Sequence, residues 1–414
     1  MNLFPQLKGM TGPQWRAFIA AYLGWTLDAF DYFLLVMVIS HVAADFHAEV
    51  KAVSEALFLT LAMRPVGALL FGLLADRFGR RPALMGSIVL YAAVELMTAF
   101  APSLAVLLVL RALFGIGMGG EWGVGASLAM ESVPAKSRGL LSGVLQQGYP
   151  MGYLLAALSY WLLFPHIGWR GMFIVGTIPA ILVVFIRAGV AESPAWAASR
   201  QPGAAARKVS DGIWATLRTR WPLFLYMIVL MMAFNCFSHG TQDLYPSLFL
   251  EKQRGLSASA ASKLTIIGCL GAISGGCLVG GLSQRFGRCR TIAVASLLAL
   301  PVIPLWVGSG SIAGLAAGAF LMQFAVQGAY GIVPAHLNEL SPAAVRGTFP
   351  GFAYQLGNLA ASRLAPFQVG LAEGHGNDYS FALGWVVGIT AVALALLAFF
   401  GPEARTAELA PEGS

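Results

Sequence analysis

Twelve long apolar runs, separated by short polar stretches, limit what this chain can fold into. They lie near residues 16–40, 54–75, 83–101, 104–130, 139–163, 170–189, 222–248, 259–283, 291–308, 311–337, 346–370 and 379–401. A helix that crosses a hydrocarbon core of about 30 Å needs roughly 20 apolar residues, and the runs approach or exceed that length. Only 11% of the residues are charged, too few to cover the surface of a water-soluble protein. The sequence therefore predicts an all-α membrane protein with twelve transmembrane helices.

A polar segment divides the runs into two sets of six. We expect an N-terminal six-helix bundle at 1–190, a cytoplasmic linker at 191–220, a C-terminal six-helix bundle at 221–402 and a mobile tail at 403–414. The first run is too long for the apolar core of a signal peptide, so we expect it to be retained as a helix. Lysines and arginines concentrate in the loops of one side. The positive-inside rule then predicts a multi-pass protein of the inner or plasma membrane with both termini in the cytoplasm.

The net charge of +7 has two possible explanations. Basic residues are typical of nucleic-acid-binding proteins, but they also accumulate in the cytoplasmic loops of membrane proteins. The apolar runs favour the second explanation, so we expect no nucleic-acid partner. The spacing of the four cysteines fits neither a metal site nor a disulfide framework, and no catalytic triad or phosphate loop is found. We therefore expect no metal, no cofactor and no enzymatic activity.

An internal repeat relates the two sets of runs at an offset of 208 residues. The nine-residue stretch that begins at Gly72 aligns with the one that begins at Gly280, and six of the nine positions are identical. The same offset aligns Glu131 and Arg138 with Glu339 and Arg346. Agreement at one shared offset indicates two homologous halves.

The repeated stretches fall on predicted cytoplasmic turns and carry charged side chains that can form ion pairs. We expect a conformational gate formed by Asp76, Arg77, Arg80, Glu131, Arg138, Arg285, Arg288, Glu339 and Arg346. Such groups can also bind the carbonyls of helix ends. Simple anchoring of the loops in the cytoplasm would explain the same charges, and both interpretations stay open. Gln284 occupies the position equivalent to Asp76, so a latch based on charge should be asymmetric.

These loops resemble those of the major facilitator superfamily. The stretch Gly72–Arg81 matches the signature loop between its second and third helices, and Arg111–Gly119 resembles its fourth-helix motif. The resemblance covers essentially the whole chain. It implies the major facilitator fold, in which two pseudo-symmetric six-helix bundles rock about a central site.

Ionisable side chains inside the runs are candidates for function, because the membrane makes them costly to keep. They are Asp28, Asp31, Arg64, Glu95, Arg111, Glu121, His239, Asp243 and Arg363. Counting about 1.5 Å per residue along each run places five of them at similar depth, which predicts one layer around a cavity. These five are Asp31, Arg64, Arg111, His239 and Arg363. A buried ion pair between Arg111 and an aspartate of the first run, with a purely structural role, is the alternative.

The seventh run concentrates polar groups on one helical face. Asn235, Ser238, His239 and Gln242 recur at i, i+3, i+4 and i+7, and Asp243 lies one turn beyond His239. The stretch resembles the span-seven signature of Jen-type lactate/pyruvate:H⁺ symporters, Asn-x-x-(Ser/Thr)-His-x-(Ser/Thr)-Gln-Asp. Ser247 stands where that family has a threonine. In that family the histidine and aspartate are assigned to proton coupling and substrate recognition, which the resemblance implies for His239 and Asp243.

The first run carries a second resemblance. The stretch Asp28–Asp31 is similar to the Asp-Gly-x-Asp element of aromatic-acid:H⁺ symporters, with Ala29 in place of glycine, and sialate:H⁺ symporters share a similar first helix. The repeat offset pairs Asp31 with His239, which suggests a proton site that straddles the two halves.

These patterns together predict a proton-coupled symporter of a small, lactate- or pyruvate-like monocarboxylate that works by alternating access. The expected proton-coupling residues are Asp28, Asp31, His239 and Asp243. The expected substrate-binding residues are Arg111, Arg363, Asn235, Ser238, Gln242, Gln147, Gln355 and Asn358. Expected partners are the carboxylate, protons and the lipid bilayer, with the protein a monomer. The alternatives are an H⁺ symporter for aromatic or sialic acids and a non-transporting nutrient sensor.

Overall fold

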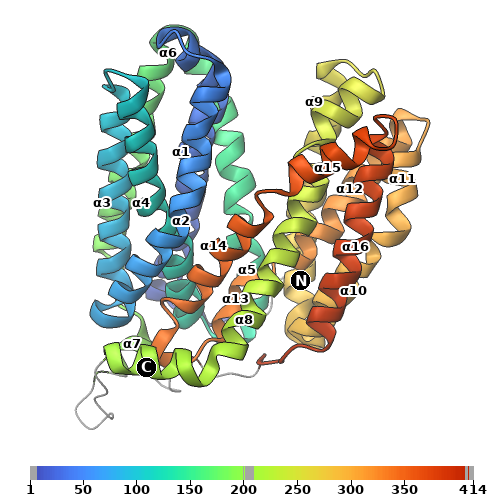
Figure 1. The fold of residues 1–414 in the computed structure, drawn as a ribbon. Coiled ribbons are helices and arrows are strands. Elements are labelled where there is room, and N and C mark those ends of the chain that lie inside the picture. Colours follow the sequence, from blue (N-terminus) through green and yellow to red (C-terminus); the bar gives the residue numbers. More distant parts are fainter. Residues whose placement is uncertain (1–6, 199, 201–208, 406–408, 410–414) are drawn as a thin grey trace.

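The structure is a computed structural model that describes residues 7–198, 200, 209–405 and 409 (Figure 1). The regular elements of these residues are all helices. Parts of the predicted linker (199 and 201–208) and of the predicted tail (406–408 and 410–414) lie outside the described residues.

The first six runs form the helices α1 to α6. Their bounds are α1 Gly12–Asp45, α2 Val50–Phe78, α3 Arg80–Ala99, α4 Leu104–Ser132, α5 Arg138–Gln146 and α6 Gly148–Ala188. Helix α6 contains the end of the fifth run and all of the sixth, and its backbone breaks at Gly168, where φ is 61°. Glycine tolerates this left-handed conformation, so the chain can reverse there between two spans. The short helix α7 (Pro194–Ala198) follows.

The last six runs form α8 to α16. Their bounds are α8 Val209–Gln242, the π-helix η3 Tyr245–Gln253, α9 Ala258–Phe286, α10 Arg288–Leu298, α11 Ile303–Gly308, α12 Ile312–Tyr330, α13 Val333–Leu340, α14 Phe349–Ala361, α15 Leu364–Glu373 and α16 Tyr379–Phe399. The ninth run is interrupted between α10 and α11 by a 3-10 turn that contains Pro301. Proline lacks the amide hydrogen that a continuous helix needs.

Within the described residues, ten helical segments are long and apolar enough to cross a membrane. The sixth run lies in α6 beyond Gly168, and the eleventh is divided between α14 and α15. The twelve predicted runs are therefore all helical. Side-chain caps mark the start of α4, α9, α12 and α16, where Ser103, Ser257, Ser311 and Asp378 accept hydrogen bonds from backbone amides of the first turn.

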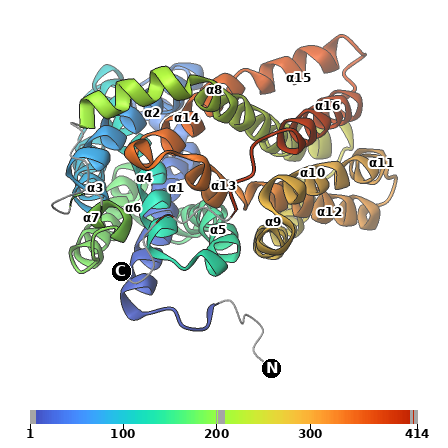
Figure 2. The same cartoon turned by 90° about the horizontal axis from the view of Figure 1, so that it is seen from below.

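The helices form two groups, α1–α6 and α8–α16, which lie side by side (Figures 1 and 2). We call the side that carries α7, the loop at Gly79 and its repeat at Gly287 the linker side. The two groups approach each other there and diverge toward the opposite side (Figure 1). Both loops turn at glycines with positive φ, 109° at Gly79 and 97° at Gly287, so the repeat extends to the backbone conformation.

Glycines allow the two groups to touch near the linker side. A Cβ atom at Gly123 of α4 would lie 2.4 Å from the Cα atom of Gly351 in α14. A Cβ atom at Gly143 of α5 would lie 2.1 Å from the carbonyl oxygen of Gly276 in α9. Distances this short exclude any side chain, so close backbone packing holds the two groups together on the linker side.

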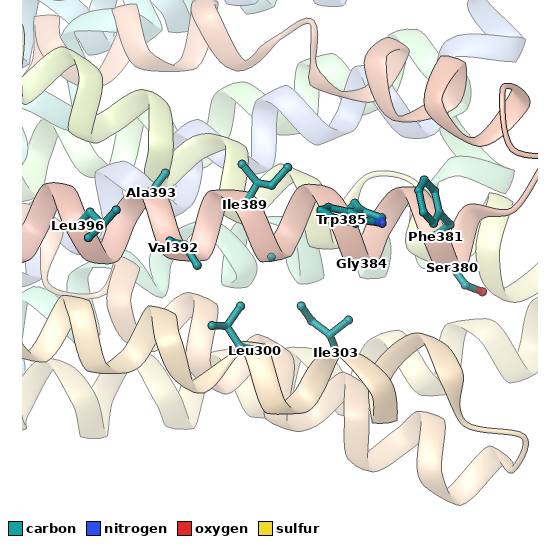
Figure 3. A pocket seen from close by; sticks show the side chains of 11 residues that line it. Leu300, Ile303, Ser380, Phe381, Gly384, Trp385, Ile389, Val392, Ala393 and Leu396 are labelled. Atoms are coloured by element: carbon teal, nitrogen blue, oxygen red, sulfur yellow. The ribbon is translucent and has the colours of Figure 1, made fainter.

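The outer surface of the second group has an apolar groove (Figure 3). It has a volume of about 810 Å³ and runs along α16 from Ser380 to Leu396, facing Leu300 and Ile303. Its neighbours Trp385 and Ile389 are more than half exposed. In a membrane protein such a surface faces lipid.

Candidate functional site

The polar stripe of the seventh run occupies the end of α8. His239 and Asp243 are 43% and 40% exposed, and His239 Nδ1 lies 3.2 Å from Asp243 Oδ1. The imidazole also contacts the side chain of Asn358 in α14 and lies within electrostatic range of Arg64 in α2. Since α2 belongs to the other helix group, this exposed pair faces the space between the two groups.

The remaining residues of the stripe bind a second polar stripe, on α12. Its members recur at i, i+4 and i+7 and are Gln323, Gln327 and Tyr330. The Tyr330 hydroxyl donates to Asn235 Oδ1 at 2.6 Å, and Gln327 Nε2 donates to Ser238 Oγ at 3.2 Å. Gln242 Nε2 donates to Gln323 Oε1 at 3.0 Å. Asn235, Ser238 and Gln242 are thus held in a network that fixes the orientation of the α8 face.

The α12 stripe was missed in the sequence, although its signal was present. Its spacing is the helical spacing of the α8 stripe, but its members are uncharged. A search limited to ionisable residues does not find these glutamines and this tyrosine. They nevertheless form most of the hydrogen bonds of the α8 face.

The three other predicted amide residues lie in different surroundings. Gln355 is buried, and its Oε1 accepts a hydrogen bond of 3.4 Å from the partly exposed Asn358. Gln147 is buried in the contact between the two groups, where a Cβ atom at Gly276 would lie 2.0 Å from its Nε2. Gln147 therefore belongs to the packed interface, whereas Asn358 contacts the exposed His239.

The predicted layer of five ionisable residues is divided between buried and exposed positions. Asp31, Arg64 and Arg111 are at most 3% exposed, whereas the side chains of His239 and Arg363 are exposed. Arg363 lies at the junction of α14 and α15, and within the described residues it forms no ion pair. Similar depth therefore did not place these groups around one surface, because depth does not determine the direction in which a side chain points.

Arg111 forms an ion pair, but not with an aspartate of the first run. Its Nη1 lies 2.7 Å from Glu95 Oε2, and both side chains are fully buried. The alternative interpretation paired Arg111 with an aspartate of the first run. That partner is wrong, because the carboxylate that binds Arg111 is Glu95 of α3. A second buried pair joins Arg187 to Glu121 at 2.5 Å. These two pairs engage Glu95 of α3 and Glu121 of α4.

Asp28 and Asp31 are closed off inside the first group. They are 0% and 1% exposed, and neither carboxyl group has a hydrogen-bond partner among the described residues. Arg64 lies within electrostatic range of Asp28, and Arg111 within range of Asp31. A carboxyl group in such surroundings is strongly favoured in its neutral form unless a cation approaches it.

Arg64 is a buried arginine of α2 that takes part in neither of these ion pairs. Its guanidinium lies 5.2 Å from the centre of the Tyr32 ring, and its Nη2 lies 2.6 Å from Met118 Sδ. Its Nε has no hydrogen-bond partner, and no ion pair with a carboxylate is found in the described part of the chain. A planar guanidinium with free donors matches a carboxylate in geometry and charge.

Stacked aromatic rings close the space between the groups one turn nearer the linker side. Trp25 stacks on Tyr149 at 5.4 Å, and Trp122 of the first group stacks on Tyr354 of the second at 4.0 Å. The Tyr354 hydroxyl also lies within hydrogen-bond distance, 3.2 Å, of the Tyr330 hydroxyl. We call Trp25, Trp122, Tyr149 and Tyr354 the aromatic floor.

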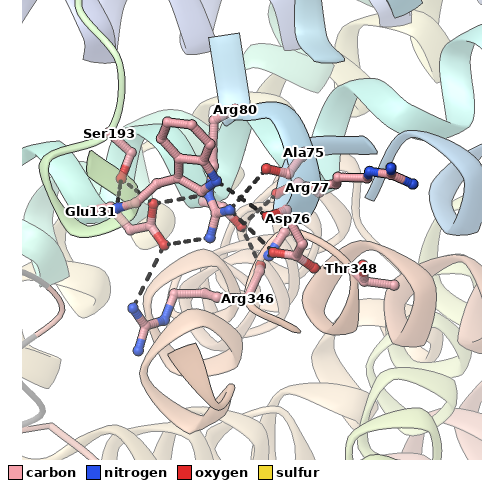
Figure 4. Close-up of polar contacts among 12 residues, drawn as sticks. Ala75, Asp76, Arg77, Arg80, Glu131, Ser193, Arg346 and Thr348 are labelled. Atoms are coloured by element: carbon pink, nitrogen blue, oxygen red, sulfur yellow. Dashed lines mark hydrogen bonds and ion pairs between the residues drawn. The ribbon is translucent and has the colours of Figure 1, made fainter. Parts of the chain in front are cut away.

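Four of the predicted gate residues meet on the linker side: Asp76, Arg80, Glu131 and Arg346 (Figure 4). Asp76 Oδ1 accepts a hydrogen bond of 2.8 Å from the Gly347 amide, and Asp76 Oδ2 accepts one of 2.7 Å from the Thr348 hydroxyl. Arg80 lies 3.1 Å from the same carboxylate. Asp76 thus ties α2 of the first group to the start of α14 in the second.

Glu131 connects Arg80 with an arginine of the other group. Arg80 Nη2 lies 3.0 Å from Glu131 Oε1, and Arg346 Nη1 lies 3.6 Å from the same oxygen. In the second copy Arg288 binds Glu339 at 2.9 Å, and Arg138 lies within electrostatic range of Glu339. Arg77 and Arg285 are exposed and lie over Phe78 and Phe286, away from these contacts.

The two copies of the gate differ in strength, in agreement with the expected asymmetry. Gln284 Oε1, at the position equivalent to Asp76, accepts a single bond from the other group, 3.3 Å from the Gly139 amide, besides one of 2.7 Å from Arg288 in its own group. Gly139 is the equivalent of Gly347 at the offset of 208. A neutral amide with one long hydrogen bond holds the groups less firmly than a carboxylate with two short ones.

Two glutamates complete the gate and were missed in the sequence. Glu192 accepts bonds of 2.9 Å and 3.2 Å from the amides of Arg80 and Arg81, and Glu403 accepts one of 3.0 Å from the amide of Cys289. Each caps the helix that follows a repeated loop. Their signal is positional, since each follows the last run of its half.

Replacing Asp76 by asparagine should open the linker side. The change removes the ion pair with Arg80 and weakens two charge-assisted bonds, each worth about 1.5–3 kcal/mol, so the ratio of open to closed molecules should rise about tenfold or more. Spin labels at the exposed, equivalent positions Lys136 and Ala344 would measure the separation of the two groups. The matched control Gln284→Ala should shift the same ratio by less than about fivefold. Equal shifts would contradict the asymmetric gate.

Comparison with known proteins gives relatives along nearly the whole chain. The family model described as Major Facilitator Superfamily matches residues 21–366. A carboxylic acid transporter protein homolog of Saccharomyces cerevisiae is 30% identical over 90% of this chain, which spans 64% of that protein's length. A putative metabolite transport protein of Haemophilus influenzae is 31% identical over 96% of both chains. The sialic acid transporter NanX of Escherichia coli is 28% identical over 87% of this chain and 88% of its own.

A solved structure agrees with the fold. The proton:xylose symporter XylE superposes with a TM-score of 0.69 over 96% of this chain and 98% of its own, at 20% sequence identity. The family match covers most of the chain and confirms the resemblance noted in the repeated loops. This protein therefore belongs to the major facilitator superfamily, and it is a multi-pass membrane transporter of small molecules rather than an enzyme.

Proposed function

We propose that the transporter is a proton-coupled symporter of a small monocarboxylate, lactate- or pyruvate-like, that works by alternating access. The observation that carries the proposal is the exposed pair of His239 and Asp243, which lies within electrostatic range of the buried Arg64 of the other group. A titratable pair opposite an arginine without a carboxylate partner suits joint binding of a proton and an organic anion. The yeast relative, named for carboxylic acids, supports the substrate class.

We assign the substrate carboxylate to Arg64. Arg111 is committed to Glu95, and releasing it would leave a buried carboxylate without a partner. Arg363 remains a second candidate because its side chain is exposed, but no contact joins it to the α8 stripe in the described chain. Arg64 has free donors and lies near both Tyr32 and His239. Asn358, which contacts His239, and Asn235, whose Nδ2 is free, complete the set of substrate contacts.

Coupling follows from the electrostatics of this arrangement. Arg64 and a protonated His239 repel each other, and a carboxylate between them offsets that repulsion. Anion and proton therefore bind more tightly together than either binds alone, which is the thermodynamic condition for symport. Asp243 stabilises the imidazolium from its other side at 3.2 Å. The enclosed Asp28 and Asp31 form a second proton store next to Arg64.

Alternating access uses the contacts of the linker side as its gate. In the present conformation Asp76, Glu131 and the close glycine pairs hold that side shut. We assign the linker side to the cytoplasm of the inner or plasma membrane, as the positive-inside rule predicts, and the two bundles to 1–190 and 221–402. One anion and one proton together add no net charge to the site, so rocking of the loaded bundles moves no additional charge through the membrane.

A symporter for aromatic or sialic acids is the second candidate. The aromatic floor favours it, because stacked rings such as Trp25 and Tyr149 provide apolar area for a flat or bulky substrate. The relative NanX, named for sialic acid, is consistent with it.

Uptake into proteoliposomes tests the proposal. Purified protein is reconstituted with an alkaline interior, and labelled lactate is added at acidic external pH. We expect lactate to accumulate above its external concentration and to leak out when a protonophore collapses the gradient. Stronger competition by benzoate or sialic acid than by pyruvate would favour the second candidate. Lactate binding without accumulation would contradict symport.

A further inference from the structure

A basic pocket lies on the linker side of the second helix group, outside the transport site. It has a volume of about 610 Å³ and lies between the start of α10 and the end of α16. Three arginines line it: Arg285, Arg290 and Arg405. Among the described residues that line it, Glu403 is the only one with a carboxylate. The pocket is therefore electropositive.

Glu403 is already engaged. Its Oε2 accepts a hydrogen bond from the Cys289 amide at 3.0 Å, and its Oε1 accepts one from the Arg405 amide at 3.1 Å. This carboxylate thus caps the start of α10. Within the part of the chain that the structure describes, Arg285, Arg290 and Arg405 form no ion pair with a carboxylate. One carboxylate does not balance the positive charge of three guanidinium groups, so the pocket favours the binding of an anion.

The pocket follows the apolar groove along α16. The groove ends at Leu396, and the pocket begins one turn further along the same helix at Phe399, which is 65% exposed. Helix α10 packs against α16 and contributes Arg290 to the pocket, and Leu300, just beyond its end, lines the groove. A charged pocket at the linker-side end of α16 therefore lies next to an apolar groove on the same helix.

The first helix group fills the equivalent place with its own chain. Arg200 donates a bond of 2.7 Å to the Arg77 carbonyl, as Arg405 does at 2.7 Å to the equivalent carbonyl of Arg285. Beside Arg200, Trp196 of α7 lies against its guanidinium and donates to the Asp76 carbonyl at 3.2 Å. In the second group the described residues leave this place as the open pocket. A ligand bound there would pack against the loop at Gly287 as α7 packs against the loop at Gly79.

We propose that the pocket binds an anionic phospholipid of the linker-side leaflet, with its phosphate between Arg285 and Arg290 and an acyl chain in the α16 groove. Charge complementarity selects the phosphate, and the groove selects a lipid over a soluble anion. From Phe399 to Ile389 the helix rises about 15 Å, which is half of the hydrocarbon core of about 30 Å. Basic pockets between helices on the cytoplasmic side are suited to anionic headgroups.

Native mass spectrometry of the detergent-solubilised protein tests the site, with phosphatidylglycerol and phosphatidylcholine as probes. We expect selective retention of phosphatidylglycerol. The double variant Arg285→Gln/Arg290→Gln should weaken its binding roughly thirtyfold, since each arginine near a membrane surface contributes about a factor of five. The control Arg218→Gln/Arg220→Gln removes two exposed arginines of the same group outside the pocket, and it should retain the lipid.

Two further experiments distinguish a bound lipid from a bound free phosphate. Ala393→Phe narrows the groove and should reduce phosphatidylglycerol retention while all three arginines remain. Inorganic phosphate at millimolar concentration should not displace the lipid. Displacement by phosphate, with an unchanged Ala393→Phe variant, would overturn the lipid assignment in favour of a soluble anion. Equal retention of phosphatidylglycerol by the wild type and the arginine double variant would overturn the site itself.

Discussion

Replacing His239 by alanine is expected to abolish proton-driven accumulation of the substrate. The imidazole is the exposed titratable group that faces Arg64, and Asp243 alone lacks a partner to share the proton with. Without this coupling, uptake should fall to equilibration with the external concentration and lose its dependence on external pH between about 5 and 8, the range in which histidine titrates. Labelled-lactate uptake in proteoliposomes with and without an imposed pH gradient measures the effect.

A matched control uses a histidine outside the site. His375 lies exposed after α15 and stacks on Phe381, far along the chain from the α8 stripe. His375→Ala should accumulate lactate as the wild type does. Counterflow, which needs no gradient, should persist in His239→Ala and show that the variant is folded and moves substrate. Unchanged gradient-driven accumulation by His239→Ala would contradict proton coupling by His239 and show that its role is packing.

Replacing Arg64 by methionine is expected to remove substrate binding while leaving the protein stable. Truncating one partner of a buried charged hydrogen bond typically costs about 2–5 kcal/mol, so the Kd for lactate should rise by about thirtyfold or more. The fold should tolerate the change, because no described carboxylate forms an ion pair with Arg64. Equilibrium binding of labelled lactate, together with a thermal-unfolding midpoint, would report both effects.

Arg111→Met provides the opposite control. It leaves Glu95 buried without its partner at 2.7 Å, and breaking such a pair costs about 3–5 kcal/mol of stability. Arg64→Met should therefore be stable but unable to bind lactate, whereas Arg111→Met should be strongly destabilised. Arg64→Lys keeps the charge but loses the planar fork, so its affinity should lie between that of the wild type and Arg64→Met. Wild-type affinity in Arg64→Met would refute its assigned role.

Much of the gate was predictable because its residues occur twice. The repeat singled out Asp76, Arg80, Glu131 and Arg346, and the structure brings all four together. The same repeat contains Arg77 and Arg285, which point away. Repetition marks a loop as important, but it does not say which of its side chains turn inward, because that depends on the helix against which the loop packs.

The transport site was predictable on one helix and not across helices. The periodicity of the α8 stripe identified His239 and its neighbours, since spacing along a single helix determines which residues share a face. Its partners on α12 and the position of Arg64 depend on which helices are neighbours and how each is rotated. Neither property is encoded in the local pattern of one run.

By itself, the sequence determined the all-helical membrane fold, the two homologous halves and the polar face of the seventh span. These follow from apolar length, periodicity and repetition, which are properties of short stretches of chain. Only the tertiary structure decided how the buried charges are paired. Arg111 forms an ion pair with Glu95 and Arg187 with Glu121, whereas Arg64 forms none with a described carboxylate. Ion pairs form between side chains that packing brings within about 4 Å, and packing is decided by the whole bundle rather than by any single helix.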